Sequence, residues 1–205
     1  MTNFHAGKRP NPYADEYASV VKQTAGHQLT VLREDGLYRH LRMHNPEMGS
    51  MWSWQVVTVP WFLTTFGDVA DGYSFSREED MLEFFSHAGT APNYYTDGAP
   101  LIDFRYWAEK LRGGRSREVK QFSPQAFIEQ VEDDLTDLEE LDETRRASIL
   151  ADAREHADDE HTARAWLDEA EQRELFGQDT WEWDCTDFDT HFLFTCWAIH
   201  LTASS

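Results

Sequence analysis

Cysteine, basic residues and long apolar runs are all scarce in this sequence. Only two cysteines occur, Cys185 and Cys196, and they form no C-x-x-C pattern, which disfavours a disulfide framework and a cysteine metal site. We expect both thiols to be buried and reduced. No apolar run reaches the ~20 residues that cross a bilayer, and the N-terminal stretch is polar instead of signal-like. The expected location is therefore the cytosol, without membrane contact.

Motifs that identify a reaction are absent as well. The patterns G-x-x-x-x-G-K-[ST], G-x-G-x-x-G, G-x-S-x-G and H-E-x-x-H do not occur. The absence of these motifs argues against a P-loop protein, a dinucleotide-binding protein, a nucleophile-elbow hydrolase and a zinc protease. An enzyme of another class stays open, but the sequence favours a protein without catalytic activity, and it predicts no cofactor.

Basic residues are outnumbered about two to one, with 18 Lys and Arg against 38 Asp and Glu and a net charge of −20. Most of the imbalance lies in residues 129–174, which contain 18 acidic residues and 5 arginines. A chain of this charge should repel nucleic acid and anionic membranes. We therefore expect neither as a direct partner.

The most informative stretch is residues 51–85, where two apolar, β-branched runs precede a turn-rich segment and an amphipathic pattern. Alternation along the first run places Trp52 and Trp54 on one strand face, which we predict to be buried. Pro60 has no N–H for a sheet, so it should separate this strand from the next. A short third strand follows, and a capping-box spacing then predicts a helix over 77–86.

The remaining segments complete an α+β fold. Residues 27–45 predict a β-hairpin, which extends the sheet to an antiparallel β-meander of about five strands packed against helices. Ser123 followed by Pro124 predicts the start of the first of three acidic helices. We predict one domain over residues 1–205. Its parts are a flexible arm (1–12), a sheet-centred core (27–122), an acidic helical region (123–176) and a buried C-terminal helix (181–203).

Two groups of histidines are candidate metal ligands. His40 and His44 share one face of a predicted strand but lie about 13 Å apart at ~3.3 Å per residue, too far for one ion. His156 and His161 flank carboxylates at a predicted helix junction, where capping and solvated charge are the better interpretation. The sequence therefore predicts no metal site.

A series of motifs runs along the chain: VTVPW, GDVADGYSFSR, DMLEFF, FRYWAEKL (104–111) and CWAIHL (196–201). In this order they resemble a family of uncharacterised proteins encoded by bacteriophages and prophages, over most of the chain from Gly36 onward. The chain departs from the family pattern at Trp61, where members tend to carry Gly. The resemblance implies a phage accessory protein that acts in the host cytoplasm, and it implies no catalytic residue.

The first functional hypothesis is a protein that binds a host or defence protein, in the manner of a counter-defence factor. Its contact surface would be the acidic helices, which could satisfy the basic groove of a DNA-binding protein by the electrostatics that DNA uses. The predicted partner-binding residues are Glu129, Glu132, Asp133, Glu139, Glu140, Asp158 and Asp159.

The second hypothesis is a small enzyme or ligand-binding domain with an aromatic pocket near Asp68. The predicted pocket residues are Trp52, Trp54, Asp68, Tyr73, Tyr94 and Tyr95. A third hypothesis is a virion or assembly component, for which oligomerisation in solution would be the indication.

Overall fold

The chain forms two compact units, the first comprising Met1–Val119 with Asp189–Ser205 and the second Lys120–Phe188. We call them the sheet unit and the helical unit. The computed structural model describes residues 8–70, 72–87, 94–113, 119–138, 141–173, 175–176 and 179–205. The sequence predicts one domain, whereas the second unit has a hydrophobic core of its own. Its start at Lys120 lies close to the predicted start of the acidic region at 123.

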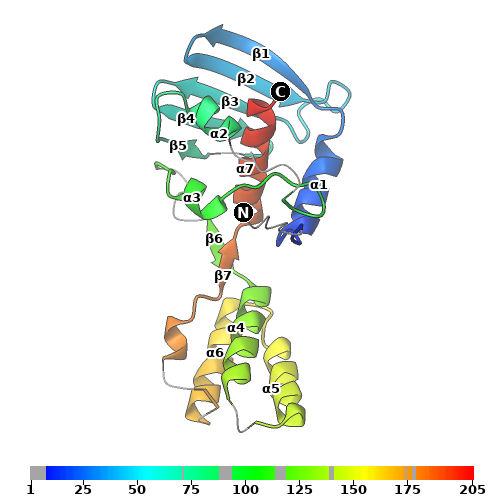
Figure 1. The fold of residues 1–205 in the computed structure, drawn as a ribbon, viewed down its shortest axis with the longest axis vertical. Coiled ribbons are helices and arrows are strands. Elements are labelled where there is room, and N and C mark those ends of the chain that lie inside the picture. The colour runs from blue at the N-terminus through cyan, green and yellow to red at the C-terminus, as the bar shows by residue number, and fades with distance from the viewer. Residues whose placement is uncertain are drawn as a thin grey trace, which may run out of the picture. The chain divides into compact units, whose positions relative to one another are not determined.

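The sheet unit contains a five-stranded antiparallel meander in the order β1-β2-β3-β4-β5 (Figure 1). This confirms the predicted α+β class and the β-meander. Gly36, with φ 59°, turns the chain between the first two strands, and this hairpin is the predicted one. The strands are β1 (Gln28–Asp35), β2 (Tyr38–His44), β3 (Trp54–Val59), β4 (Phe62–Gly67) and β5 (Ser74–Phe75).

Alternation along β3 buries one strand face. Trp54, Val56 and Thr58 expose 1%, 0% and 2% of their surface, so the predicted burial of this face is confirmed. The predicted position of Trp52 on the same strand is wrong, because β3 begins two residues later and Trp52 lies in the preceding turn with φ 58°. Its ring still packs against Phe194, with the centroids 5.4 Å apart.

Helices of the sheet unit gather on one face of the meander. Helices α7 and α2 lie over the sheet, with α1 beside α7 (Figure 1). Helix α7 is buried along most of its length, as predicted for the last helix, but it does not span 181–203, because the preceding residues form a strand. The helices are α1 (Ala14–Thr24), α2 (Met81–Ser86), α3 (Phe104–Ala108) and α7 (Thr190–Ala203).

The opposite face of the sheet carries apolar side chains in contact with solvent. Tyr38, Val59 and Phe66 expose 50%, 37% and 37% of their surface. The predicted flexible arm is fixed by backbone pairing in part of its length. Its residues 1–7 lie outside the described residues, whereas the backbone of Arg9 pairs with Tyr95.

The helical unit is a three-helix cluster closed by a two-stranded ribbon. Strand β6 (Lys120–Phe122) pairs antiparallel with β7 (Thr186–Phe188), so the chain enters and leaves the unit side by side. Ser123 caps the first helix, as predicted, by accepting from the backbone N–H of Ala126 at 3.2 Å. The helices are α4 (Pro124–Asp137), α5 (Glu143–Glu155) and α6 (Glu160–Gln172), followed by the short η1 (Thr180–Glu182).

The core of the helical unit is aromatic and aliphatic. Phe127, Val131 and Leu167 are at most 1% exposed, and the ring of Trp166 meets that of Phe127 edge-on with centroids 5.9 Å apart. These residues repeat at helical spacing, which turns one side of each helix inward and leaves the acidic side in solvent. Among the described residues, no helix is long and apolar enough to cross a membrane.

Candidate functional site

Charge is distributed very unequally between the two units. Residues 120–188 contain 22 Asp and Glu against 6 Lys and Arg, a net charge of −16. The rest of the chain contains 16 against 12, a net charge of −4. The helical unit therefore carries most of the net negative charge of the protein.

Two arginines of the helical unit donate to backbone carbonyl oxygens, whereas Lys120, Arg154 and Arg173 pair with carboxylates. Arg146 donates to the carbonyl oxygens of Leu138 and Leu141 at 2.6 and 3.1 Å. Arg164 donates to the carbonyl oxygen of Trp183 at 3.1 Å. The guanidinium groups of Arg146 and Arg164 thus satisfy carbonyl oxygens at helix and loop ends.

The acidic side chains predicted to bind a partner lie in two places. Glu129, Glu132 and Asp133 are on α4, and Asp158 and Asp159 are at the junction of α5 and α6. The predicted residues at 139 and 140 lie outside the described residues.

Asp159 has a structural task, because its carboxylate accepts from the backbone N–H of Thr162 at 3.0 Å and caps α6. The hydroxyl and the backbone N–H of Thr162 together lower the pKa of Asp159 from its ordinary value. The capping role expected for this junction is thus confirmed for Asp159.

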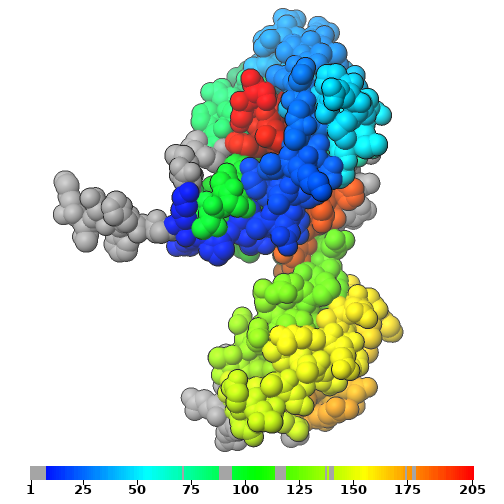
Figure 2. Space-filling view, turned by 90° about the vertical axis from the view of Figure 1, so that its right-hand side faces the viewer, coloured from blue at the N-terminus to red at the C-terminus, as the bar shows by residue number. Residues whose placement is uncertain are grey.

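A depression of about 450 Å³ brings two of the predicted positions together. Figure 2 shows the surfaces of α4 and α5 side by side in the helical unit. Glu132 and Asp158, which are 26 positions apart in the sequence, both line this depression. We call it the α4/α5 groove. Its lining residues are Pro124, Gln125, Ile128, Glu132, Arg154, Ala157 and Asp158.

A second depression of about 300 Å³ lies between α5 and α6. Its wall includes Trp166, whose indole N–H donates to Asp152 at 2.9 Å, and His156, whose Nδ1 is 3.9 Å from the same carboxylate. Asp152 thus serves to hold the two helices together.

No group of three or more His, Cys, Asp or Glu side chains with metal-binding geometry occurs among the residues that the structure describes.

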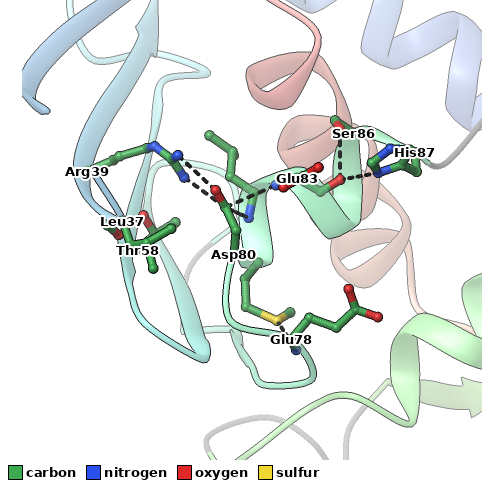
Figure 3. Close-up of polar contacts among 10 residues, drawn as sticks. Leu37, Arg39, Thr58, Glu78, Asp80, Glu83, Ser86 and His87 are labelled. Carbon is green, nitrogen blue, oxygen red and sulfur yellow. Dashed lines mark hydrogen bonds and ion pairs between the residues drawn. The ribbon is translucent and has the colours of Figure 1, made fainter. Parts of the chain in front are cut away.

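A third depression of about 420 Å³ lies in the sheet unit beside an ion pair. Figure 3 shows Arg39 reaching from β2 to Asp80 at the start of α2. The Nη1 and Nη2 atoms of Arg39 donate to the Oδ1 and Oδ2 atoms of Asp80, each at 2.8 Å. Each side chain is only 18% exposed. The hydrogen bond from Arg39 outweighs burial and lowers the pKa of Asp80, and the same bond raises the pKa of Arg39.

Asp80 also caps α2, by accepting from the backbone N–H groups of Leu82 and Glu83 at 3.0 and 3.1 Å. The predicted helix start at Arg77 is wrong for this reason, since the capping residue is Asp80 and not Ser76. The Arg39–Asp80 pair therefore anchors a helix to the sheet, and both partners are occupied by that task.

The predicted aromatic pocket is largely filled. Trp54 donates its indole N–H to Thr202 of α7 at 2.8 Å, and Tyr73 is 1% exposed. Asp68 accepts from the backbone N–H of Trp52 at 2.7 Å and so fixes the turn before β3. The structure thus assigns packing and turn-forming roles to these residues.

The two remaining pocket residues, Tyr94 and Tyr95, meet edge-on with ring centroids 5.0 Å apart. The backbone carbonyl of Tyr94 accepts from the N–H of Arg9 at 3.0 Å, which ties this segment to the N-terminal stretch. The two tyrosines thus pack against each other and beside Arg9.

Sequence reasoning missed the apolar floor and the single cation of the α4/α5 groove, and it missed the Arg39–Asp80 pair. The pair joins residues 41 positions apart without any local pattern. Sequence reasoning also missed Trp181 of the helical unit, whose surface is 70% exposed. A Trp next to acidic residues in a turn-rich segment was the one signal available.

Comparisons of this chain with protein-family models, with curated proteins and with solved structures gave no match.

Proposed function

We propose that this chain is an accessory protein that acts by binding a basic protein through its acidic helical unit. The observation that carries the proposal is the concentration of a net charge of −16 in residues 120–188. Its motif resemblance to phage-encoded proteins supports a host or defence protein as the partner, met in the host cytoplasm. The charge supports a DNA-binding protein in particular.

The spacing of carboxylates on α4 is close to that of phosphates on DNA. Glu129, Glu132 and Asp133 lie on one side of the helix and span about 6 Å at a rise of ~1.5 Å per residue. The charges are thus about 3 Å apart on average along the helix axis, against one phosphate per ~3.4 Å along one strand of duplex DNA. A basic groove that accepts phosphates would therefore meet a comparable line of charge, held rigid by a capped helix.

The test is a capture experiment with the tagged full chain in bacterial host lysate, at low and at high salt, with mass spectrometry of the retained proteins. We expect a DNA-binding protein that is retained at low salt and released by high salt or by added duplex DNA. A partner whose retention changes neither with salt nor with added duplex DNA would contradict charge mimicry of DNA. If no protein is retained under either condition, the binding function itself is contradicted.

The same capture is repeated with a test variant that carries the changes Glu129→Gln, Glu132→Gln and Asp133→Asn. This variant keeps the size and hydrogen-bonding capacity of the three side chains and removes three charges. It should retain much less of the same partner at low salt, while its helix content by circular dichroism stays unchanged.

A further inference from the structure

The α4/α5 groove combines an apolar floor with an acidic rim. Ile128 and Ala157 form part of its floor and are 9% and 7% exposed. Glu132 and Asp158 stand on the rim, and the rest of the α4 acidic side begins next to it, where Gln125 donates to Glu129 at 2.7 Å. A long cationic side chain suits such a place, because its aliphatic stem can cover the floor while its charged end meets the carboxylates.

One such side chain already lies in the groove. Arg154 lines it from α5, and its Nη2 is 4.0 Å from the Oε1 of Glu132. The two side chains are 57% and 56% exposed, and the separation is longer than a charge-assisted hydrogen bond of ~2.8 Å. An exposed pair of this kind stabilises a fold by only about 0 to 1 kcal/mol, so it can be exchanged at little cost.

We infer that the α4/α5 groove receives an arginine side chain of the basic partner, which takes the place of Arg154 beside Glu132 and Asp158. This inference rests on the proposed function and gives it a location. The guanidinium of the partner forms close, two-pronged hydrogen bonds with a rim carboxylate, a geometry that the internal pair does not reach. Arg154 then acts as an internal competitor that lowers the affinity for weakly basic proteins.

The test uses the full chain and a fluorescently labelled octa-arginine peptide, with the dissociation constant measured by fluorescence anisotropy. The groove variant is Glu132→Gln with Asp158→Asn. The matched control is Glu143→Gln with Asp168→Asn, which removes the same charge from the same unit away from the groove. We expect the groove variant to bind about tenfold more weakly and the control about twofold more weakly. An octa-lysine peptide should show a smaller difference between the two variants.

A second comparison addresses Arg154. The change Arg154→Gln should tighten binding of the octa-arginine peptide by about threefold more than Arg145→Gln, which removes an equal charge from the same helix. Thermal unfolding of each variant verifies that the fold is kept.

The outcomes separate the location from the function. If the two double variants weaken binding equally, and the two arginine variants strengthen it equally, the groove is overturned while binding by the acidic unit stands. If the unaltered chain does not bind the octa-arginine peptide even at low salt, the proposed function fails together with the groove.

Discussion

Trp61 has a backbone conformation that residues with a side chain rarely adopt. It is the second residue of the two-residue connection between β3 and β4, with φ 70°, and its side chain is 56% exposed. The left-handed region costs a residue other than Gly about 1 to 2 kcal/mol. Its N–H donates to the carbonyl oxygen of Glu79 at 2.9 Å, a bond that any residue except proline would keep.

We expect Trp61→Gly to raise the free energy of unfolding by about 0.5 to 1 kcal/mol, because relief of the left-handed strain exceeds the added backbone entropy of Gly in the unfolded chain. Urea unfolding followed by circular dichroism measures it. Trp61→Ala is the control, since it removes the same ring and keeps the strain, and it should give no gain. Equal stability of the Gly and Ala variants would show that the conformation at this position is not strained.

At the scale of single residues, the sequence predicts the burial of side chains that alternate along a strand. It does not predict the positions of residues whose contacts lie far away in the sequence. The burial of Trp54 and Val56 follows from their two-residue spacing. The position of Trp52 does not, because two positive φ angles, at Trp52 and Gly49, bend the chain before β3. Asp68 is a predicted pocket residue in the sequence, but turns demand the same residue type for backbone reasons.

Helix α2 is held to the sheet by a half-buried ion pair between Arg39 and Asp80. The pKa of Asp80 is lower in the folded state than its ordinary value of 3.8. A carboxyl group of this kind stabilises the fold above its unfolded pKa, and this contribution is lost as the pH falls through the folded value. The stabilisation by Asp80 is therefore complete at neutral pH, begins to decline near pH 3.8, and is lost as the pH falls through the lower folded pKa.

Asp80→Asn should lower the free energy of unfolding by about 2 kcal/mol at pH 7, because Asn can still cap the helix but cannot pair with Arg39. The difference between the two proteins should shrink as the pH is lowered from 5 through the folded pKa. Urea unfolding over that pH range measures both. The control is Asp35→Asn, whose pair with Arg33 is 3.8 Å long and exposed, and which should cost less than about 0.5 kcal/mol. A pH-independent loss for Asp80→Asn would assign its effect to packing instead of charge.

Element starts were predictable where the capping signal was unambiguous. Ser123 followed by Pro124 gave the start of α4. Two candidate caps compete before α2, and the choice of Asp80 over Ser76 depends on Arg39, which approaches from another strand. The sequence contains the cap but not the contact that selects it.

At the scale of the whole molecule, the helical unit is an insertion with adjacent ends. Lys120 is paired with Phe188, and just outside them the N–H of Asp189 donates to the carbonyl oxygen of Val119 at 2.9 Å. Opposite residues of antiparallel strands are about 5 Å apart, so a short turn can join them. Each unit also has its own buried residues.

Replacement of residues 120–188 by a four-residue Gly-containing turn should leave a sheet unit that folds cooperatively, because none of its own strands or core helices is removed. Residues 120–188 expressed alone should retain the helical signal. Circular dichroism and thermal unfolding of both pieces measure this. Loss of cooperative unfolding in the excised sheet unit would contradict the insertion.

The charge pattern of the sequence located the helical unit, because acidic residues concentrate where three helices share one small core. It could not locate the α4/α5 groove. That depression depends on how α4 meets the end of α5, which is a tertiary contact between segments about 30 residues apart.

The place of α7 in the chain has a consequence for biosynthesis. The last strand of the meander ends at Phe75, and the helix that covers the sheet begins only at Thr190. A ribosome that adds ~5 to 20 residues per second needs about 6 to 23 seconds to bridge that interval. During this time the helical unit can fold on the growing chain, while the side of the meander that will hold α7 stays uncovered. The nascent protein should therefore engage chaperones at its oldest part, and least at the acidic unit made in between.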